Sequence, residues 1–168
     1  MNITGIGLRH PKDNSDTPDR TVLIVFHGNG EVIENYVKTS FRADLFDTCC
    51  IDLFLFEYRG YGYFSTESHP DLIGILTDLK SVYETLTNMG MYYQCPFRIE
   101  RSLGYEERNM VVMGRSLGSL FAVEYASRHT KIAGLIIESG FSRIDDFLIK
   151  RWKHRFHKEG NQIPDRAE

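Results

Sequence analysis

The sequence contains few cysteines, and none of them has a partner at a spacing typical of a disulfide framework or a metal site. The three cysteines are Cys95 and the adjacent pair Cys49 and Cys50, and an odd, scattered set of this kind predicts reduced thiols. A zinc site would need Cys-x-x-Cys or histidine spacing, which these residues lack. We therefore expect no bound metal and no cofactor.

Long apolar runs and an excess of basic charge are also missing. No stretch approaches the roughly 18 apolar residues of a membrane span, and residues 1–7 lack the basic start and the apolar core of a secretory signal. A cytoplasmic location is therefore expected. The formal charge of −3 gives no electrostatic reason for a nucleic acid to be a main partner.

The chain has enough apolar residues for one hydrophobic core. Its 168 residues are 42% hydrophobic, which suits a single globular domain. We expect this domain over residues 1–158, followed by a polar tail over residues 159–168.

Apolar segments and amphipathic segments alternate along the chain. Residues 22–26 (VLIVF) form a continuous apolar run, as a central parallel strand needs, and residues 72–86 carry apolar side chains at helical spacing. This alternation predicts an α/β fold, with a mostly parallel sheet, flanking helices and right-handed crossovers. Strands are expected at residues 3–8, 22–26, 51–58, 110–113 and 132–138, and helices from about residue 31, at 72–86 and at 116–128.

Three other segments have patterns of their own. The turn-rich residues 10–18 suggest that the first two strands form a hairpin. Residues 90–108 show no periodicity and are longer than an ordinary connection, so we expect a surface insertion there. Residues 144–158 have apolar side chains every four positions among lysines and arginines, which predicts a basic amphipathic helix able to contact an acidic membrane or a partner protein.

The pattern Gly-x-Ser-x-Gly at residues 114–118 (GRSLG) directly follows an apolar strand. A strand that leads into this pattern mounts a serine nucleophile in a strained turn before a helix. Gly114 and Gly118 would let neighbouring backbone approach without Cβ clashes. Ser116 is therefore the candidate nucleophile, the alternative being an ordinary serine at a helix start. Ser102 lies in the same tetrapeptide, RSLG, but a glutamate replaces the first glycine and no apolar strand precedes it.

Loops after three strands carry the residues of interest. Ligands of an open α/β sheet bind at the carboxyl ends of its strands, and residues 27–30 (HGNG), residues 59–62 (RGYG) and Ser116 all follow expected strands. Acyl transfer needs hydrogen-bond donors aimed at the developing oxyanion. A backbone N–H of the loop at 27–30 and the N–H of Leu117, which opens a helix, can provide them.

Three motifs in this order, HGNG at 27–30, EYRGYG at 57–62 and GRSLGS at 114–119, resemble the α/β-hydrolase superfamily. The most similar branch is the group of serine hydrolases with HGN and GRSLG signatures, which includes protein depalmitoylases and esterase-like proteins. The resemblance spans about residues 3–152. It implies a serine hydrolase that acts on carboxylic ester or thioester bonds of a small-molecule or acyl ester substrate.

The resemblance also implies roles for single residues. Ser116 would be the nucleophile and form an acyl-serine intermediate, and the backbone N–H groups of Asn29 and Leu117 would form the oxyanion hole. His27 is expected to shape the oxyanion loop rather than act as the base, because the triad order on this fold is serine, acid, histidine. Glu138 ends a strand and is a candidate for the acid, although in the similar sequences this position is structural. The remaining site-shaping residues would be Gly28, Gly30, Gly114 and Gly118.

The acid and the histidine of a catalytic triad are not identifiable in this sequence. A serine nucleophile needs a base and an orienting carboxylate, and on this fold both follow later strands, which we do not expect after Ser142. The residues with formally the right order are Asp145 or Asp146 followed by His154 or His157. A single helix, however, would place His154 about 13 Å along its axis from Asp145, pointing away from Ser116.

Three explanations fit this pattern, and we favour the first. The chain is a fragment or truncated product of a larger enzyme, a shortened and inactive hydrolase that acts as a binding or scaffold protein, or an enzyme completed by a second polypeptide. Without further strands, the sheet edge at residues 132–137 is expected to be unpaired and apolar, which favours dimerisation or aggregation.

Overall fold

The computed structural model describes residues 4–8, 20–39, 48–62, 69–87, 92–95, 98–101 and 104–143. The basic helix predicted at 144–158 and the polar tail predicted at 159–168 lie outside these residues. No helix in the described part of the chain is long and apolar enough to cross a bilayer. The described elements are β1 (Thr4–Leu8), β2 (Val22–Phe26), α1 (Ile33–Lys38), β3 (Asp52–Glu57), α3 (Leu72–Thr87), β4 (Tyr92–Cys95), β5 (Arg98–Arg101), a 3-10 helix (Glu107–Asn109), β6 (Met110–Arg115), α4 (Gly118–Arg128) and β7 (Gly134–Glu138).

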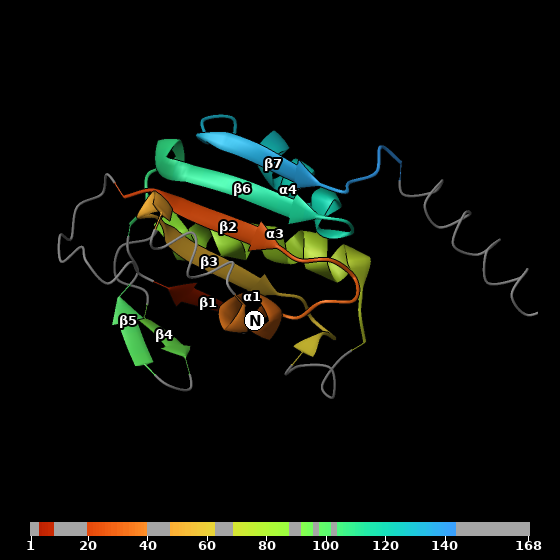
Figure 1. Cartoon of the computed structure of the whole chain (residues 1–168), viewed down its shortest axis with the longest axis horizontal. Coiled ribbons are helices and arrows are strands. Elements are labelled where there is room, and N and C mark those ends of the chain that lie inside the picture. The colour runs from red at the N-terminus through yellow and green to blue at the C-terminus, as the bar shows by residue number, and fades with distance from the viewer. Residues whose placement is uncertain are drawn as a thin grey trace, which may run out of the picture.

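The main sheet has five strands in the order β1-β3-β2-β6-β7 (Figure 1). Strands β3, β2, β6 and β7 run parallel to one another, while β1 is antiparallel to β3. The continuous apolar run of β2 is buried along its whole length, because β2 lies at the centre of the sheet with helices on both faces. The mostly parallel α/β sheet predicted from the sequence is confirmed.

The pairing of β1 differs from the prediction. Its partner is β3, with Thr4 opposite Glu57 and Leu8 opposite Leu53, so the hairpin predicted between residues 3–8 and 22–26 is wrong. A strand has two edges for hydrogen bonding, and β3 and β6 already occupy both edges of β2. The free edge of β3 is then the place where β1 can pair.

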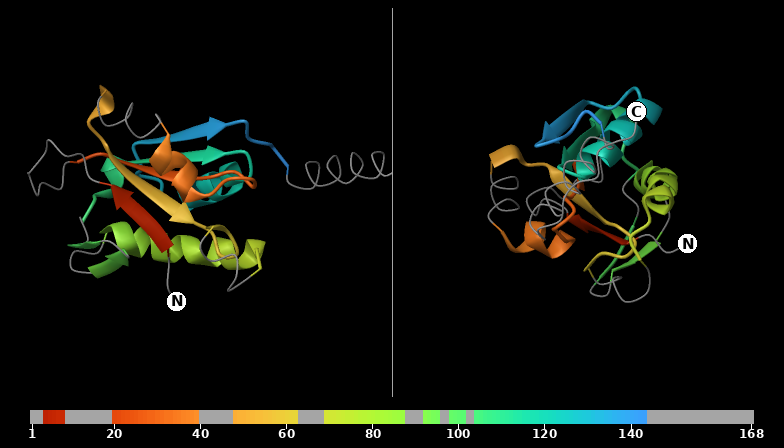
Figure 2. Two further views of the ribbon diagram at one scale, coloured as in Figure 1. Left: turned by 60° about the horizontal axis from the view of Figure 1, so that its bottom comes forward. Right: turned by 90° about the vertical axis from the view of Figure 1, so that its right-hand side faces the viewer.

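Alternate side chains of the central strands enter two separate cores. Val22, Ile24 and Phe26 belong to the core beneath α3 and α4, whereas Leu23 and Val25 belong to the core beneath α1. The end-on view in Figure 2 shows α3 and α4 on one side of the sheet and α1 on the other. Each fully buried aliphatic or aromatic side chain contributes about 1.5–3 kcal/mol of transfer free energy. The two cores therefore fix the sheet from both faces.

Helix α3 closely matches the helix predicted at residues 72–86. Its buried side chains recur at steps of three and four residues and face the larger core. The Asp71 carboxylate accepts the backbone N–H groups of Ile73 and Gly74, at 3.2 and 3.1 Å, and so caps the helix start.

Part of the predicted insertion is regular. Strands β4 and β5 form a separate antiparallel pair, with Tyr92 opposite Arg101 and Cys95 opposite Arg98. The expectation of a non-periodic insertion at 90–108 therefore misses a two-stranded sheet. Strands of four residues are too short for an alternation of side chains to stand out in the sequence.

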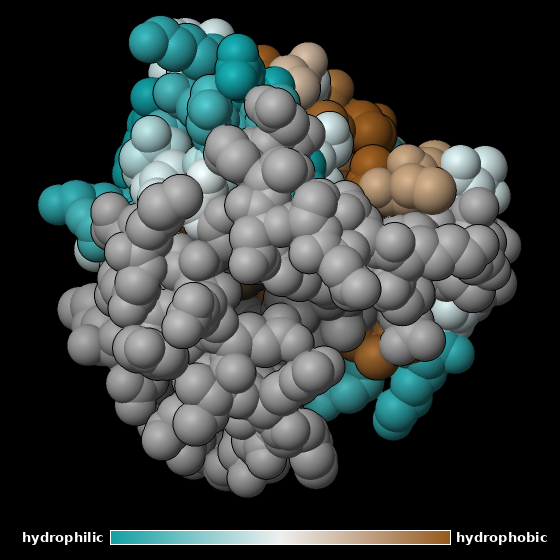
Figure 3. All heavy atoms as spheres, turned by 90° about the vertical axis from the view of Figure 1, so that its left-hand side faces the viewer, coloured by the Kyte–Doolittle hydropathy of each residue, from teal (hydrophilic) through white to brown (hydrophobic). Residues whose placement is uncertain are grey.

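Strand β7 lies at one edge of the main sheet. Leu135, Ile136 and Ile137 remain 42%, 46% and 43% exposed, so apolar side chains on both faces of this strand reach the surface. Figure 3 shows the resulting hydrophobic surface at the upper right of the molecule. Among the described strands, β6 alone pairs with β7, as expected for an unpaired apolar edge. Dimerisation through this edge stays a prediction.

A buried polar cluster lies at the amino ends of the central strands. The Arg20 guanidinium makes a two-pronged ion pair with the Asp52 carboxylate, with Nε 2.7 Å from Oδ2, and both side chains are buried. The Tyr105 hydroxyl donates to the same carboxylate at 2.6 Å. This cluster ties the segment before β2, the start of β3 and the segment before β6 together.

Candidate active site

Ser116 lies in the turn between β6 and α4 with a φ angle of +50°, which is unusual for a residue with a side chain. Its N–H donates to the Glu138 carbonyl at 2.9 Å. Its own carbonyl accepts the Ser119 N–H at 3.0 Å and the Ser119 hydroxyl at 2.6 Å. Contacts on both sides therefore hold the strained strand-to-helix turn that the Gly-x-Ser-x-Gly pattern predicts.

The two glycines of this pattern lie where backbone approaches closely. A Cβ atom at Gly118 would collide with the carbonyl group of Phe26, the last residue of β2, and would lie 2.7 Å from the His27 oxygen. A Cβ atom at Gly114 would lie 2.5 Å from the Gly118 oxygen and 2.6 Å from the Ala122 Cβ. Glycine at 118 therefore lets the first turn of α4 pack directly on the end of β2, and glycine at 114 lets α4 pack closely on β6.

The loop at residues 27–30 passes beside Ser116. A Cβ atom added at Gly28 would lie 3.5 Å from the Ser116 Cβ. The Gly28 carbonyl accepts the Glu31 N–H at 3.1 Å and contacts Nδ1 of His27 at 2.9 Å. In a planar trans peptide the N–H points opposite to the carbonyl. Fixing the Gly28 carbonyl therefore also fixes the direction of the Asn29 N–H.

Two backbone donors are left without a partner near Ser116. Within the described residues, neither the Asn29 N–H nor the Leu117 N–H has a hydrogen-bond acceptor, whereas the Gly28 N–H donates to Oε2 of Glu31 at 2.8 Å. Leu117 precedes the first residue of α4, so its N–H belongs to the end of the helix that favours negative charge. The arrangement can stabilise an oxyanion.

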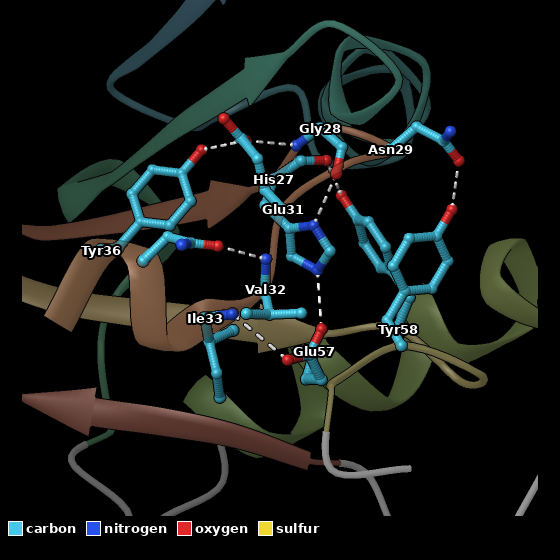
Figure 4. A network of polar contacts seen from close by, with 11 residues as sticks. His27, Gly28, Asn29, Glu31, Val32, Ile33, Tyr36, Glu57 and Tyr58 are labelled. Carbon is cyan, nitrogen blue, oxygen red and sulfur yellow. Dashed lines mark hydrogen bonds and ion pairs between the residues drawn. The ribbon is translucent and has the colours of Figure 1, made fainter. Parts of the chain in front are cut away.

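The side chain of His27, the first residue of this loop, is buried and has contacts at both ring nitrogens. Nε2 lies 2.8 Å from Oε1 of Glu57, and the other oxygen of that carboxylate accepts the Ile33 N–H at 3.2 Å (Figure 4). The Tyr58 hydroxyl donates to the His27 carbonyl at 2.8 Å. Since neither ring nitrogen is free to take a proton from Ser116, the ring is placed to hold the loop.

Two tyrosines of the motif at 57–62 support the same loop. The Tyr61 hydroxyl donates to the side-chain oxygen of Asn29 at 2.6 Å, and the ring of Tyr58 lies 4.0 Å from the His27 ring, centre to centre. Burial raises the pKa of Tyr58 and of Tyr61, so both phenols stay neutral donors. Sequence reasoning assigned no role to Glu57, Tyr58 or Tyr61, although their place at the end of the strand beside β2 was a usable signal.

An ion-pair network surrounds the residue before Ser116. The Arg115 guanidinium contacts the carboxylates of Glu31 and Glu138, with Nε 3.2 Å from Oε1 of Glu138. Glu138 thus binds the turn at residues 114–118, called the elbow below, through both its side chain and its backbone carbonyl. These contacts suit the structural alternative for this residue. The network borders a hollow of about 280 Å³ between α1 and the ends of β6 and β7.

Gly30 lacks the steric constraint of the other predicted site-shaping glycines. It is exposed, and no atom lies within 4 Å of the place where its Cβ would be, so nothing in the described structure requires glycine there.

A general base does not contact Ser116 in the described part of the chain, where the Ser116 hydroxyl makes no hydrogen bond to another side chain. His129 caps the far end of α4 and stacks on Tyr83, with ring centres 3.9 Å apart. Asp145, Asp146, His154 and His157 lie outside the described residues. Within those residues, no group of three or more potential ligands could hold a metal ion.

The strand order, the elbow at Ser116 and the adjoining donor loop together define an α/β-hydrolase fold. The chain belongs to the α/β-hydrolase family described as serine aminopeptidase, S33, whose model matches residues 17–166. No curated protein matches the sequence.

Solved structures with this fold cover almost the whole chain. BpoC from Mycobacterium tuberculosis H37Rv, a proposed non-heme bromoperoxidase, is 14% identical with a TM-score of 0.57, and the match covers 98% of this chain and 51% of BpoC. MenH from S. aureus is 18% identical with a TM-score of 0.53, covering 88% of this chain and 47% of MenH. A proposed hydrolase from Agrobacterium vitis S4 is 13% identical with a TM-score of 0.52, and the match covers 99% of this chain and 66% of that hydrolase. The chain therefore spans about half the length of the first two, and at these identities the likeness concerns the fold.

Proposed function

We propose that Ser116 is the nucleophile of a serine hydrolase that cleaves carboxylic ester or thioester bonds. The observation that supports this most directly is the pairing of a strained serine with two backbone donors, on Asn29 and Leu117, that have no acceptor among the described residues. A carbonyl oxygen that gains negative charge is a natural partner for such donors.

The proposed reaction has two stages. Ser116 Oγ attacks the carbonyl carbon of the substrate and loses its proton to a base, while the carbonyl oxygen becomes an oxyanion facing the amides of Asn29 and Leu117. The alcohol or thiol then leaves with a proton and an acyl-Ser116 remains. Water attacks this acyl group, releases the carboxylic acid and regenerates the serine.

The base and the acid of this mechanism are placed outside the described residues, in a longer form of the protein. Among the described residues His27 is engaged by Gly28 and Glu57, and Glu138 is engaged by Arg115. The length ratio with BpoC and MenH leaves room for such residues in a longer chain.

Labelling with a fluorophosphonate probe tests the nucleophile in the 168-residue chain. We expect Ser116→Ala to abolish labelling, because the probe bonds to an activated serine oxygen. Ser127→Ala is the matched control, since Ser127 lies exposed on α4 and its hydroxyl only caps the Glu124 carbonyl at 2.8 Å. Equal labelling of Ser116→Ala contradicts the proposal, and no labelling above background shows that Ser116 is not a competent nucleophile in the 168-residue chain.

Substrate class is tested separately with matched chromogenic substrates. An acyl ester and an acyl thioester should be hydrolysed in a Ser116-dependent way, and an aminoacyl anilide serves as the comparison because the family description refers to an aminopeptidase. Exclusive cleavage of the anilide would contradict the ester or thioester assignment while leaving Ser116 as the nucleophile.

A binding or scaffold role on an inactive hydrolase fold is the second candidate. The observation in its favour is the Ser116 hydroxyl without a base among the described residues. This candidate predicts that an acyl ligand raises the melting temperature without turnover. Ser116-dependent ester hydrolysis eliminates it.

A further inference from the structure

Glu31 contacts both parts of the proposed oxyanion site. Its Oε2 atom accepts the Gly28 N–H at 2.8 Å and the Tyr36 hydroxyl at 2.7 Å (Figure 4). Its Oε1 atom forms an ion pair with Arg115, the residue directly before Ser116. One carboxylate therefore joins the loop at 27–30 to the elbow.

We propose that Glu31 is a positioning residue that holds the oxyanion loop in its catalytic orientation, and that Arg115 offsets the negative charge of Glu31 at this place. The role in catalysis rests on the proposed function of Ser116, whereas the effect on the loop can be measured independently.

The loop depends on residue 31 at two points. The Glu31 carboxylate accepts the Gly28 N–H, and the Glu31 backbone N–H donates to the Gly28 carbonyl at 3.1 Å. Gly28 has no side chain to restrict its rotation. Without the carboxylate, the Gly28 N–H loses its acceptor, and only the contacts of the Gly28 carbonyl with the Glu31 N–H and the His27 ring still orient the peptide that carries the Asn29 N–H. We expect this peptide to be less firmly held. The donor would then face the substrate oxygen less often.

The charge of Glu31 needs compensation because a carboxylate beside an oxyanion site opposes the developing negative charge. Arg115 provides a positive charge in direct contact, and the nearby Glu31 and then Glu138 raise the pKa of Arg115, which stays protonated. Removal of Arg115 would leave the carboxylates of Glu31 and Glu138 next to the elbow without their cation.

Four variants separate the two effects, with the rate of fluorophosphonate labelling as the first readout. Glu31→Ala removes the acceptor and should slow labelling at least about tenfold, which is less than the roughly 10²–10³-fold typical when an oxyanion donor is removed outright. Glu31→Gln keeps an acceptor oxygen and should stay within about threefold of the native rate. Arg115→Met should slow labelling, and the double variant Glu31→Gln with Arg115→Met should restore most of the rate.

The double variant is the decisive comparison. If Arg115 were needed only for packing, adding Glu31→Gln would not restore labelling, because the arginine side chain would still be missing. Restoration requires that the uncompensated charge of Glu31 is the cause. Glu124→Gln is the matched control, since it breaks the exposed Glu124–Arg128 ion pair on α4 and should leave the labelling rate unchanged.

Amide hydrogen exchange of residues 27–32 is the second readout and does not depend on chemistry at Ser116. Exchange at Gly28 should rise in Glu31→Ala and stay near native in Glu31→Gln. Even if the native chain is labelled, native exchange in Glu31→Ala overturns the positioning role of Glu31, and a double variant as slow as Arg115→Met overturns the charge compensation by Arg115. An unlabelled native chain shows that Ser116 is not competent in the 168-residue chain, and the exchange result then decides the role of Glu31 alone.

Discussion

The two ends of the central strands carry polar clusters of opposite character. At the amino ends, Arg20, Asp52 and Tyr105 bind one another and are buried. At the carboxyl ends, about 15 Å away along strands of this length, a larger network surrounds the loop at 27–30 and Ser116. The same strands thus carry both clusters, one at each end.

The difference lies in what each cluster leaves unpaired. At the amino ends, the side-chain charges and the phenol satisfy one another, as is usual for a structural cluster. At the carboxyl ends, the side chains of His27 and Glu31 are also engaged, yet the N–H groups of Asn29 and Leu117 have no acceptor among the described residues. The carboxyl-end network holds these two donors in place but does not form hydrogen bonds with them. Donors left available in this way are typical of a binding or catalytic site.

The largest expected effect comes from breaking the amino-end cluster. Asp52→Asn leaves the Arg20 guanidinium buried beside a neutral amide, so we expect a loss of about 3–5 kcal/mol in the free energy of unfolding. Urea denaturation measures this loss. The fluorophosphonate labelling rate of the remaining folded protein should be unchanged. A loss below about 1 kcal/mol would show that the pair is effectively solvated.

A smaller loss of stability, coupled to a loss of reactivity, is expected at the carboxyl ends. Gly118→Ala places a methyl group against the Phe26 carbonyl and should cost about 1–3 kcal/mol, because α4 must move away from β2. The same movement displaces the Leu117 N–H, so Ser116 labelling should fall as well. Gly30→Ala is the control and should change neither property. Unchanged labelling in Gly118→Ala would show that the reactivity of Ser116 does not depend on the position of α4.

The smallest effect concerns the pH dependence of stability, at a residue far from Ser116 at the other end of α4. Burial lowers the pKa of His129 below its ordinary value, with the nearby Glu107 only partly opposing this shift. Between the two pKa values the unfolded chain binds more protons than the folded chain, so stability falls as the pH drops below about 6.5. Melting temperatures at pH 7.5 and 5.5 should differ less in His129→Gln than in the native chain. An identical difference in both would contradict a contribution from His129.

Much of the fold followed from local patterns. The apolar run of β2 and the helical spacing in α3 predicted elements that the structure confirms, because burial on two faces and burial on one face leave different periodicities in a sequence. The turn at Ser116 was predictable for a similar reason. Gly114 and Gly118 mark places where a Cβ atom cannot fit, and this constraint acts within a few residues of the strand and the helix.

Contacts between distant residues were not predictable in the same way. The partner of β1 depended on which strand edge remained free after β2 was enclosed, so the predicted hairpin was wrong. The pairs His27–Glu57 and Glu31–Arg115 join residues 30 and 84 positions apart, and no local pattern links their members. Their existence depends on the strand order β3-β2-β6, which brings the ends of those three strands together.

Local sterics and periodic burial act within short stretches of chain. They were enough to specify the strands of the main sheet, the helices that pack on it and a serine on a tight turn. The orientation of the donor on Asn29 and the compensation of charge at Glu31 arise only after three strands are ordered side by side. Hydrogen bonds and ion pairs act over a few ångströms in space, whatever the separation along the chain. The assembled sheet, rather than any single motif, therefore decides how the site is held.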